Sequence, residues 1–282
     1  MEKVLVVGAL GLIGKELMSS LGEKAIGIDV NVAEKKILKA DISNYSALEK
    51  VFQENRISSC VNLAAIALPL ECEKNKKDAF LVNVAGNLNL LELCAQYDVE
   101  FYYASSVRVY DTSRIANEDS PVNPSGVYMK TKVLSEKIIQ AYFERKLLKK
   151  AIIFRFSNVY GKDNHKDRLI PSLISQTKGG AVEITNSNTK FDLIYVKDVV
   201  KAILLSMEKS KGFQIYNVVS GKLLSVEQIA KILIKKINPS ATLRIKSKQS
   251  VNYPVVSNEK IKNLGLIPVS FEQSLDEIVA YY

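Results

Sequence analysis

The chain has 282 residues and a net charge of +9, and 47% of its residues are hydrophobic and 24% charged. This ordinary globular composition excludes disordered, collagen-like and coiled-coil proteins. The three cysteines form no C-x-x-C pair and His165 is the only histidine, so we expect neither a disulfide framework nor a metal site.

The positive charge is spread along the chain rather than concentrated. One local cluster, Arg244, Lys246 and Lys248, lacks interleaved aromatic residues, so we expect a solvated lysine-rich surface and no nucleic-acid partner. The apolar run over residues 4–14 is too short to span a bilayer and has no basic segment before it or cleavage site after it. The sequence predicts a soluble cytoplasmic protein with no membrane partner.

Apolar strands alternate with amphipathic helices in the first half of the chain. Strands are expected over residues 3–7, 25–29, 60–64, 100–105 and 151–156. Helices are expected over 13–21, 46–55, 79–97 and 127–143. This alternation predicts an α/β protein with a doubly wound parallel sheet.

The second half is less regular. Helices are expected over residues 168–177, 199–207, 226–237 and 271–282, and short strands over 181–184, 213–218 and 242–245. We therefore predict two domains. The larger covers residues 1–160 and takes in part of 192–218, and a smaller α/β region covers 161–282.

A glycine motif follows the first strand. Gly8, Gly11 and Gly14 recur at three-residue intervals, which allows a tight turn and a close approach of the backbone to a pyrophosphate. The helix that follows offers unpaired N–H groups to the phosphates. The second strand ends in Asp29, whose carboxylate suits an adenosine ribose and would repel a 2′-phosphate. The motif predicts a dinucleotide site that prefers NAD to NADP.

A second constellation pairs a phenol with an amine. Tyr128 and Lys132 are four residues apart and face the same side of a predicted helix. A neighbouring ammonium favours the phenolate, so we expect Lys132 to lower the pKa of Tyr128 and make it a general acid or base. Ser105 and Ser106 end a strand at the edge where open α/β sheets bind ligands.

Taken together, these motifs resemble those of the extended short-chain dehydrogenases/reductases, in the NAD-dependent epimerase/dehydratase family. The resemblance extends over nearly the whole chain. It also includes residues 41–42, 62–65 (Asn-Leu-Ala-Ala), 82–83, 105–110, Pro124, 155–161 (Arg-Phe-Ser-Asn-Val-Tyr-Gly), 192–199 and 216–218.

This resemblance implies a Rossmann-type fold, an NAD cofactor and nucleotide-activated sugars as small-molecule substrates. Tyr128 would exchange a proton with a substrate oxygen, Ser106 would hydrogen-bond the same oxygen, and Lys132 would hold the nicotinamide ribose. The implied cofactor contacts are Gly8, Leu10, Gly11, Leu12, Ile13, Gly14, Asp29, Val30, Asp41, Ile42, Leu63, Ala64, Ala65, Asn83, Ala104, Tyr128, Lys132 and Ser157. The implied substrate contacts are Ser106, Arg108, Asn158 and Lys190.

The sequence departs from the family pattern in ways that narrow the reaction. Sugar 4,6-dehydratases have an Asp-Glu pair directly after the catalytic hydroxyl, whereas this chain has Val107 and Arg108, which disfavours a dehydratase. Arg108 also replaces the cysteine of the GDP-fucose-synthase branch. Phe191 stands where nucleotide-sugar epimerases have a phosphate-binding arginine, and Lys190 beside it would compensate.

Three functions remain. The first is an epimerase that keeps its NAD bound, and the second is a reductase of a 4-keto-6-deoxy nucleotide sugar, because residues 71–75 and 121–132 resemble the dTDP-4-dehydrorhamnose reductase branch. A non-catalytic dinucleotide-binding regulatory subunit is disfavoured by the intact Ser106, Tyr128 and Lys132 set. Family dimers pack the helices that match 79–97 and 127–143, so we expect a homodimer. The candidate outer-face residues Leu88, Leu91 and Ile138 fit a dimer and core packing equally well. We expect Cys72 to be a surface-loop thiol.

Overall fold

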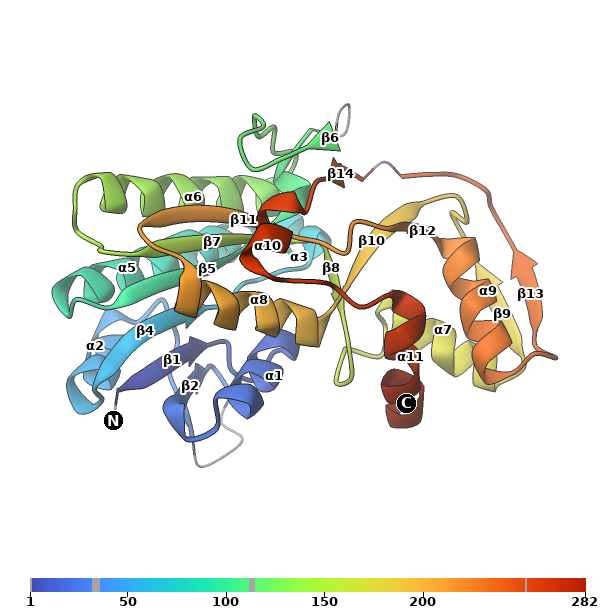
Figure 1. The fold of residues 1–282 in the computed structure, drawn as a ribbon, viewed down its shortest axis with the longest axis horizontal. Coiled ribbons are helices and arrows are strands. Elements are labelled where there is room, and N and C mark those ends of the chain that lie inside the picture. The colour runs from blue at the N-terminus through green and yellow to red at the C-terminus, as the bar shows by residue number, and fades with distance from the viewer. Residues whose placement is uncertain (1, 32–35, 112–114, 252) are drawn as a thin grey trace.

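The larger part of the molecule is a parallel sheet whose seven strands lie in the order β11-β7-β5-β4-β1-β2-β3 (Figure 1). The computed structural model describes residues 2–31, 36–111, 115–251 and 253–282. The strands are β1 (Lys3–Val7), β2 (Ala25–Asp29), β3 (Ile37–Lys39), β4 (Ile57–Asn62), β5 (Glu100–Ser106), β7 (Ala151–Phe156) and β11 (Phe213–Val218). All neighbouring pairs run parallel, which confirms the predicted fold class.

Helices cover both faces of this sheet. α2 (Tyr45–Glu54), α5 (Asn87–Gln96) and α6 (Val127–Glu144) pack on one face, and α1 (Leu12–Leu21), α8 (Val196–Lys209) and α10 (Glu259–Leu264) pack on the other. Successive side chains of β1 point to opposite faces of the sheet. Leu5 and Val7 therefore belong to the hydrophobic core on one face and Val6 to the core on the other. Strands that are apolar on both faces are what a covered parallel sheet requires.

A smaller group of elements lies beside the main sheet (Figure 1). It contains the sheet β12-β10-β8 and the pair β13-β9. Its strands are β8 (Asn158–Tyr160), β9 (Ala181–Ile184), β10 (Lys190–Tyr195), β12 (Leu223–Ser225) and β13 (Thr242–Ile245), and its helices are α7 (Leu169–Lys178), α9 (Val226–Ile237) and α11 (Phe271–Tyr281). A further pair, β6 (Ile115–Ala116) and β14 (Val255–Val256), packs with α6 through Ala116 and Val133. Because β11 belongs to the main sheet, the chain returns to the larger part after β10.

The predicted helix over residues 79–97 is interrupted. The chain forms α4 (Lys76–Phe80), a π-helical turn (Leu81–Gly86) and then α5. The hydroxyl of Ser135 on α6 donates to the backbone carbonyl of Asn83 at 2.8 Å. This bond gives a carbonyl within the π-helical turn a hydrogen-bond partner from another helix. Leu91 is wrongly expected on an outer face, since it is fully buried in the core of the sheet.

Two other expectations are wrong nearby. The strand expected at 60–64 is displaced to Ile57–Asn62, because the Asn62 side chain accepts from the Ala64 N–H and turns the chain. Cys72 is a fully buried thiol within α3 (Pro69–Lys74) rather than a surface-loop thiol. No helix in the described part of the chain combines the length and the apolar character needed to cross a bilayer.

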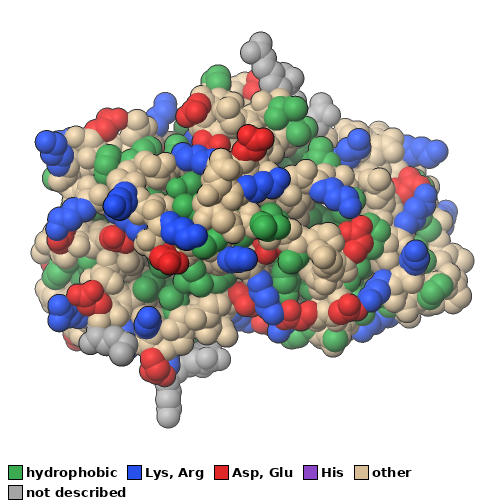
Figure 2. Space-filling view, viewed as in Figure 1, with side chains coloured by type: hydrophobic (Ala, Val, Ile, Leu, Met, Phe, Trp, Pro, Cys, Tyr) green, Lys and Arg blue, Asp and Glu red, His purple; other side chains and the backbone are tan. Residues whose placement is uncertain are grey.

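Lysine and arginine side chains are dispersed over the face drawn in Figure 2, among acidic side chains. The cluster that begins on β13 follows this pattern in part, since Arg244 on the strand and Lys246 just after it both pair with Glu183. On this face the positive charge is dispersed rather than concentrated in one patch.

Candidate active site

The turn from β1 into α1 forms a narrow cradle of backbone. Gly8 has φ +79°, and a Cβ at Gly14 would lie 2.2 Å from the Gly8 carbonyl oxygen, so both positions require glycine. Gly11 caps α1 and offers no side chain to its first N–H groups. These groups are therefore available to an anion at the positive end of the helix dipole.

Asp29 lies next to this cradle at the carboxyl end of β2. Its two carboxylate oxygens accept from the backbone N–H groups of Leu10 and Asn31, each at 3.1 Å. The first bond connects the carboxylate directly to the glycine turn. A carboxylate oxygen has more than one acceptor site, so Asp29 keeps capacity for ribose hydroxyls.

The other residues expected at the adenine end are arranged in different ways. Val30 is 53% exposed beside Asp29, whereas Ile42 is buried, and a Cβ at Gly86 would lie 2.5 Å from its Cγ1. Asp41 uses one carboxylate oxygen to accept from the N–H and the hydroxyl of Ser43, both at 2.8 Å. This bond closes a local turn and leaves its other oxygen toward solvent.

The loop that follows β4 is held by two buried asparagines. Asn62 donates to Asn87 Oδ1 at 3.0 Å. Asn83 accepts from the N–H of Ile66 at 2.8 Å, donates to its carbonyl at 3.1 Å and donates to Thr131 on α6 at 3.1 Å. The segment with Leu63, Ala64 and Ala65 is thus fixed at the carboxyl edge of the sheet beside α6.

Lys132 is enclosed beside the end of β5. Its ammonium nitrogen donates to the Ala104 carbonyl at 2.7 Å and lies 4.7 Å from the ring centroid of Tyr103 and 5.8 Å from that of Tyr128. The Tyr128 phenol has no hydrogen-bond partner among the residues that the structure describes. An ammonium has three donors, so Lys132 also retains hydrogen-bonding capacity for a ligand.

Ser106 lies on the element that α6 packs against. Its hydroxyl oxygen accepts from the Arg108 N–H at 3.3 Å and caps a 3₁₀ turn (Val107–Val109). The hydroxyl proton remains free to donate to a substrate oxygen. Ser105 points elsewhere and donates to the buried Glu136, so the two neighbouring serines have different roles.

Burial shifts both titrating groups away from their charged forms. It lowers the pKa of Lys132 to about 8, and it raises the pKa of Tyr128 to about 12. The positive charges of Arg108 and Arg168 oppose the second shift, while Cys72 adds to it. The expectation that Lys132 lowers the pKa of Tyr128 is therefore wrong for the chain alone, because desolvation dominates and the ammonium is directed to the Ala104 carbonyl.

The cofactor candidate Ser157 and the substrate candidates Asn158 and Lys190 lie in two different places. Ser157 donates to Asp192 Oδ1 at 2.7 Å and Asn158 donates to the Asp192 carbonyl at 3.2 Å, so both are fixed to β10. Lys190 lines a separate hollow of about 440 Å³ together with Glu227 and Lys231. The structure does not bring Lys190 to Tyr128.

Several residues of the site were not anticipated from the sequence. Glu136 forms a buried ion pair with Arg155, with Nη2 and Oε2 2.6 Å apart. Its spacing from Lys132 is again four residues, and this signal places Glu136 on the same face of α6. The Cys72 thiol donates to the Ile66 carbonyl at 3.2 Å, and Asp192 accepts from Ser157 and two backbone N–H groups. The roles of Cys72 and Asp192 depend on contacts between segments that are distant in the sequence, and the spacing of residues along the chain does not indicate such contacts.

Comparison with known proteins agrees with this geometry. The model of the NAD dependent epimerase/dehydratase family matches residues 4–219. The chain belongs to this family. Membership confirms the resemblance seen in the sequence and establishes NAD as the cofactor, and the cradle at Gly8, Gly14 and Asp29 fits a dinucleotide.

Individual relatives carry out different reactions. The chain is 26% identical over 269 residues to a dTDP-D-glucose 4,6-dehydratase of Dictyostelium discoideum, which is 83% of this chain but only 62% of that protein. It is 25% identical to a dTDP-4-dehydro-6-deoxyglucose reductase of Escherichia coli, covering 85% of this chain and 83% of the relative. A crystal structure of UDP-glucose 4-epimerase from Thermotoga maritima with UDP-glucose superposes with a TM-score of 0.91 at 25% identity, covering 99% and 98% of the two chains.

Proposed function

We propose that the protein is an NAD-dependent nucleotide-sugar epimerase that works by transient hydride transfer, with Ser106, Tyr128 and Lys132 as its catalytic set. The observation that carries this proposal is the phenol of Tyr128, which lies beside Lys132 and has no hydrogen-bond partner within the described ranges, on the helix that packs against the end of β5. The larger part of the molecule would hold NAD, and the smaller part would hold the sugar nucleotide.

The chain's own residues account for the proton transfers. Tyr128 exchanges a proton with the reacting hydroxyl or carbonyl, and Ser106 donates a hydrogen bond to the same oxygen. Lys132 binds the ribose of the cofactor and adds a positive charge near the phenol. NAD supplies the hydride acceptor and donor, while the protein orients it. Because burial keeps the phenol protonated in the chain alone, a base role for Tyr128 depends on the positive charges that face it.

Elimination of water is disfavoured despite the dehydratase relative. Dehydratases of this family place an acidic pair after the catalytic hydroxyl, and Val107 and Arg108 occupy these positions here. Val107 is buried and apolar, and Arg108 stacks on Tyr253 at 5.3 Å. Neither side chain acts as the acid or the base of an elimination.

The second candidate is a reductase of a 4-keto-6-deoxy nucleotide sugar. It is favoured by the reductase relative and by Phe191, which packs against Tyr253 at 4.8 Å where an epimerase arginine is expected. The two reactions use the same three catalytic residues. They differ in whether the oxidised cofactor leaves after each turnover.

The experiment that separates them is the cofactor content of gently purified protein. The protein is denatured and the supernatant is assayed for NAD(H) and NADP(H). Stoichiometric NAD supports the epimerase, because its cofactor is regenerated in place. An empty protein that binds NADH or NADPH reversibly supports the reductase, and a protein that binds neither dinucleotide contradicts both.

We also propose a homodimer built on the α4 and α6 region. Phe80, Leu81 and Leu134 are 42%, 49% and 40% exposed on neighbouring elements there, and exposed apolar side chains that lie near one another are typical of an interface. Sedimentation of the wild-type protein and of Leu134→Glu tests this. A dimer that dissociates on substitution supports the proposal, and a monomeric wild type contradicts it.

A further inference from the structure

Arg108 is a half-buried cation with no carboxylate partner in the described part of the chain. Its backbone N–H is bound to the Ser106 hydroxyl at 3.3 Å, so the residue is fixed to the turn that carries the proposed catalytic serine. The contrast with Arg155 is informative, because that buried guanidinium is neutralised by Glu136. A guanidinium that is partly removed from water and not neutralised by the protein suits an anionic ligand.

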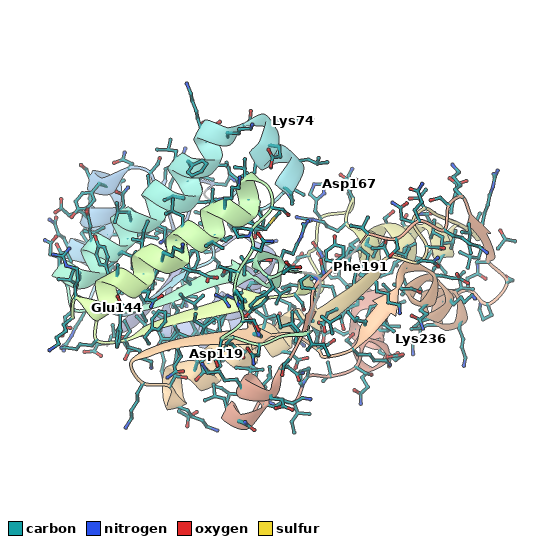
Figure 3. The ribbon with its side chains drawn as sticks, turned by 90° about the horizontal axis from the view of Figure 1, so that it is seen from above. Lys74, Asp119, Glu144, Asp167, Phe191 and Lys236 are labelled. Atoms are coloured by element: carbon teal, nitrogen blue, oxygen red, sulfur yellow. The ribbon has the colours of Figure 1, made fainter. Side chains whose placement is uncertain are left out.

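An aromatic shelf fixes the Arg108 side chain in place. The guanidinium carbon lies 5.3 Å from the ring centroid of Tyr253, and this ring packs against Phe191 with centroids 4.8 Å apart. Phe191 lies where the smaller part of the molecule meets the larger (Figure 3). A stacked guanidinium keeps its N–H fork in its plane, which preorganises it to bind an oxyanion through two hydrogen bonds.

The positive charge also faces the reacting group. Both Arg108 and Arg168 lower the pKa of the Tyr128 phenol, so their fields reach the atom that would exchange the substrate proton. Arg168 precedes α7 and forms no ion pair with any described carboxylate. Two cations, one after β5 and one before α7, therefore act on the phenol, and none of the described carboxylates forms an ion pair with either of them.

We propose that Arg108, held on the Tyr253–Phe191 shelf, binds an oxyanion of the substrate close to the reacting carbon. A sugar carboxylate and a phosphoryl group offer the same chemistry to a guanidinium fork. The inference rests on the proposed function, because it assumes a nucleotide sugar bound with its reacting oxygen at Ser106 and Tyr128. It adds a ligand-binding residue and the chemistry of its ligand, an oxyanion carried by the sugar nucleotide.

The test measures ligand affinity by calorimetry on NAD-loaded protein. The probes are UDP, UDP-glucose and UDP-glucuronate together with their thymidine counterparts, and the variants are Arg108→Met, Arg108→Lys and Tyr253→Leu. Lys130→Met is the matched control, since it removes one exposed positive charge from α6 two residues from Tyr128. NAD content and the thermal midpoint establish that each variant is folded.

If Arg108 binds a sugar carboxylate, we expect the wild type to bind UDP-glucuronate at least tenfold more tightly than UDP-glucose. Arg108→Met then removes this preference without weakening UDP, and Tyr253→Leu reduces it. If Arg108 binds a phosphoryl group instead, we expect Arg108→Met to lower the affinities for UDP, UDP-glucose and UDP-glucuronate by the same factor of ten or more. Wild-type affinities for all probes in folded Arg108→Met overturn the inference alone, whereas a wild type that binds NAD but none of the probes overturns the proposed function as well.

Discussion

The carboxylate of Glu73 accepts a hydrogen bond from the backbone N–H of Val127 at 2.7 Å. Val127 is the first residue of α6, the helix that carries Tyr128 and Lys132, and the residue before it is Gly126, which has no side chain to cap the helix. A carboxylate on α3 therefore caps α6 from another segment of the chain, and its negative charge lies at the positive end of the helix dipole.

Removing this cap should loosen the start of α6. We expect Glu73→Ala to lower the free energy of unfolding by about 1 kcal/mol and to reduce kcat more than it raises KM, because Tyr128 is the second residue of the helix. Glu73→Gln should restore part of both. Glu71→Ala on the same short helix is the control, and equal effects of the two alanine substitutions would contradict the capping role.

Substitutions at Gly14 and Gly11 should distinguish the contribution of the glycine turn to stability from its contribution to NAD binding. Gly14→Ala places a Cβ 2.2 Å from the Gly8 carbonyl oxygen, so it should destabilise the protein by about 2 kcal/mol or more. Gly11→Ala meets only the Gly8 oxygen at 3.3 Å and has ordinary backbone angles, so its stability should change by less than about 1 kcal/mol. Its affinity for NAD should nevertheless fall at least tenfold, as measured by fluorescence titration. Unchanged NAD affinity in folded Gly11→Ala would exclude a pyrophosphate at this turn.

The buried pair of Glu136 and Arg155 supports the site from behind. Besides the ion pair, Glu136 accepts from Ser105, and Arg155 donates to the Tyr110 hydroxyl at 2.6 Å. Truncation of one partner leaves a buried charge, so Glu136→Ala should cost about 3 kcal/mol or more in urea unfolding. The double substitution Glu136→Leu with Arg155→Met should cost less than the sum of the single ones. Additive effects would show that the two charges are independent.

Stability should rise with pH through the titration of Lys132. Its pKa is about 8 in the folded chain and 10.5 when exposed, so between these values the unfolded chain binds a proton that the folded chain does not. Linkage then predicts that the wild type gains roughly 2 kcal/mol relative to Lys132→Met between pH 7 and pH 9.5 in the absence of cofactor. Urea unfolding of both proteins at the two pH values measures this gain. A constant difference would show that the ammonium is well solvated.

The elements with clear periodicity could be predicted from the sequence. The strands β1, β2, β7, β9, β11 and β13 and the helix α9 have the predicted bounds. The glycine turn, Asp29 and the Tyr128/Lys132 pair could be identified because their spacing is local. The parallel, doubly wound character of the sheet follows from the same alternation of strands and helices, whereas the order of its strands was not predicted.

The remaining features depend on contacts between distant segments. The π-helical turn is stabilised by hydrogen bonds of Ser135 and Thr131 on α6 with Asn83. The spacing of apolar residues, from which the helix was predicted, does not indicate such bonds. β10 was not expected as a strand, because its pattern mixes charged and apolar residues and its partners are the short strands β8 and β12. The pKa of Tyr128 was expected to shift in the wrong direction because spacing indicates a neighbouring charge but not the extent of burial.

The central claim is that Tyr128 moves a proton while hydride passes between NAD and a nucleotide sugar. It is tested most directly by mixing NAD-loaded wild type and Tyr128→Phe with UDP- and dTDP-hexoses, following the absorbance of the reduced cofactor at 340 nm and separating the sugar nucleotides by chromatography. We predict formation of reduced cofactor or epimerised product with the wild type. With Tyr128→Phe we predict a decrease of at least a hundredfold without loss of NAD binding. Equal rates in the two proteins would contradict the account.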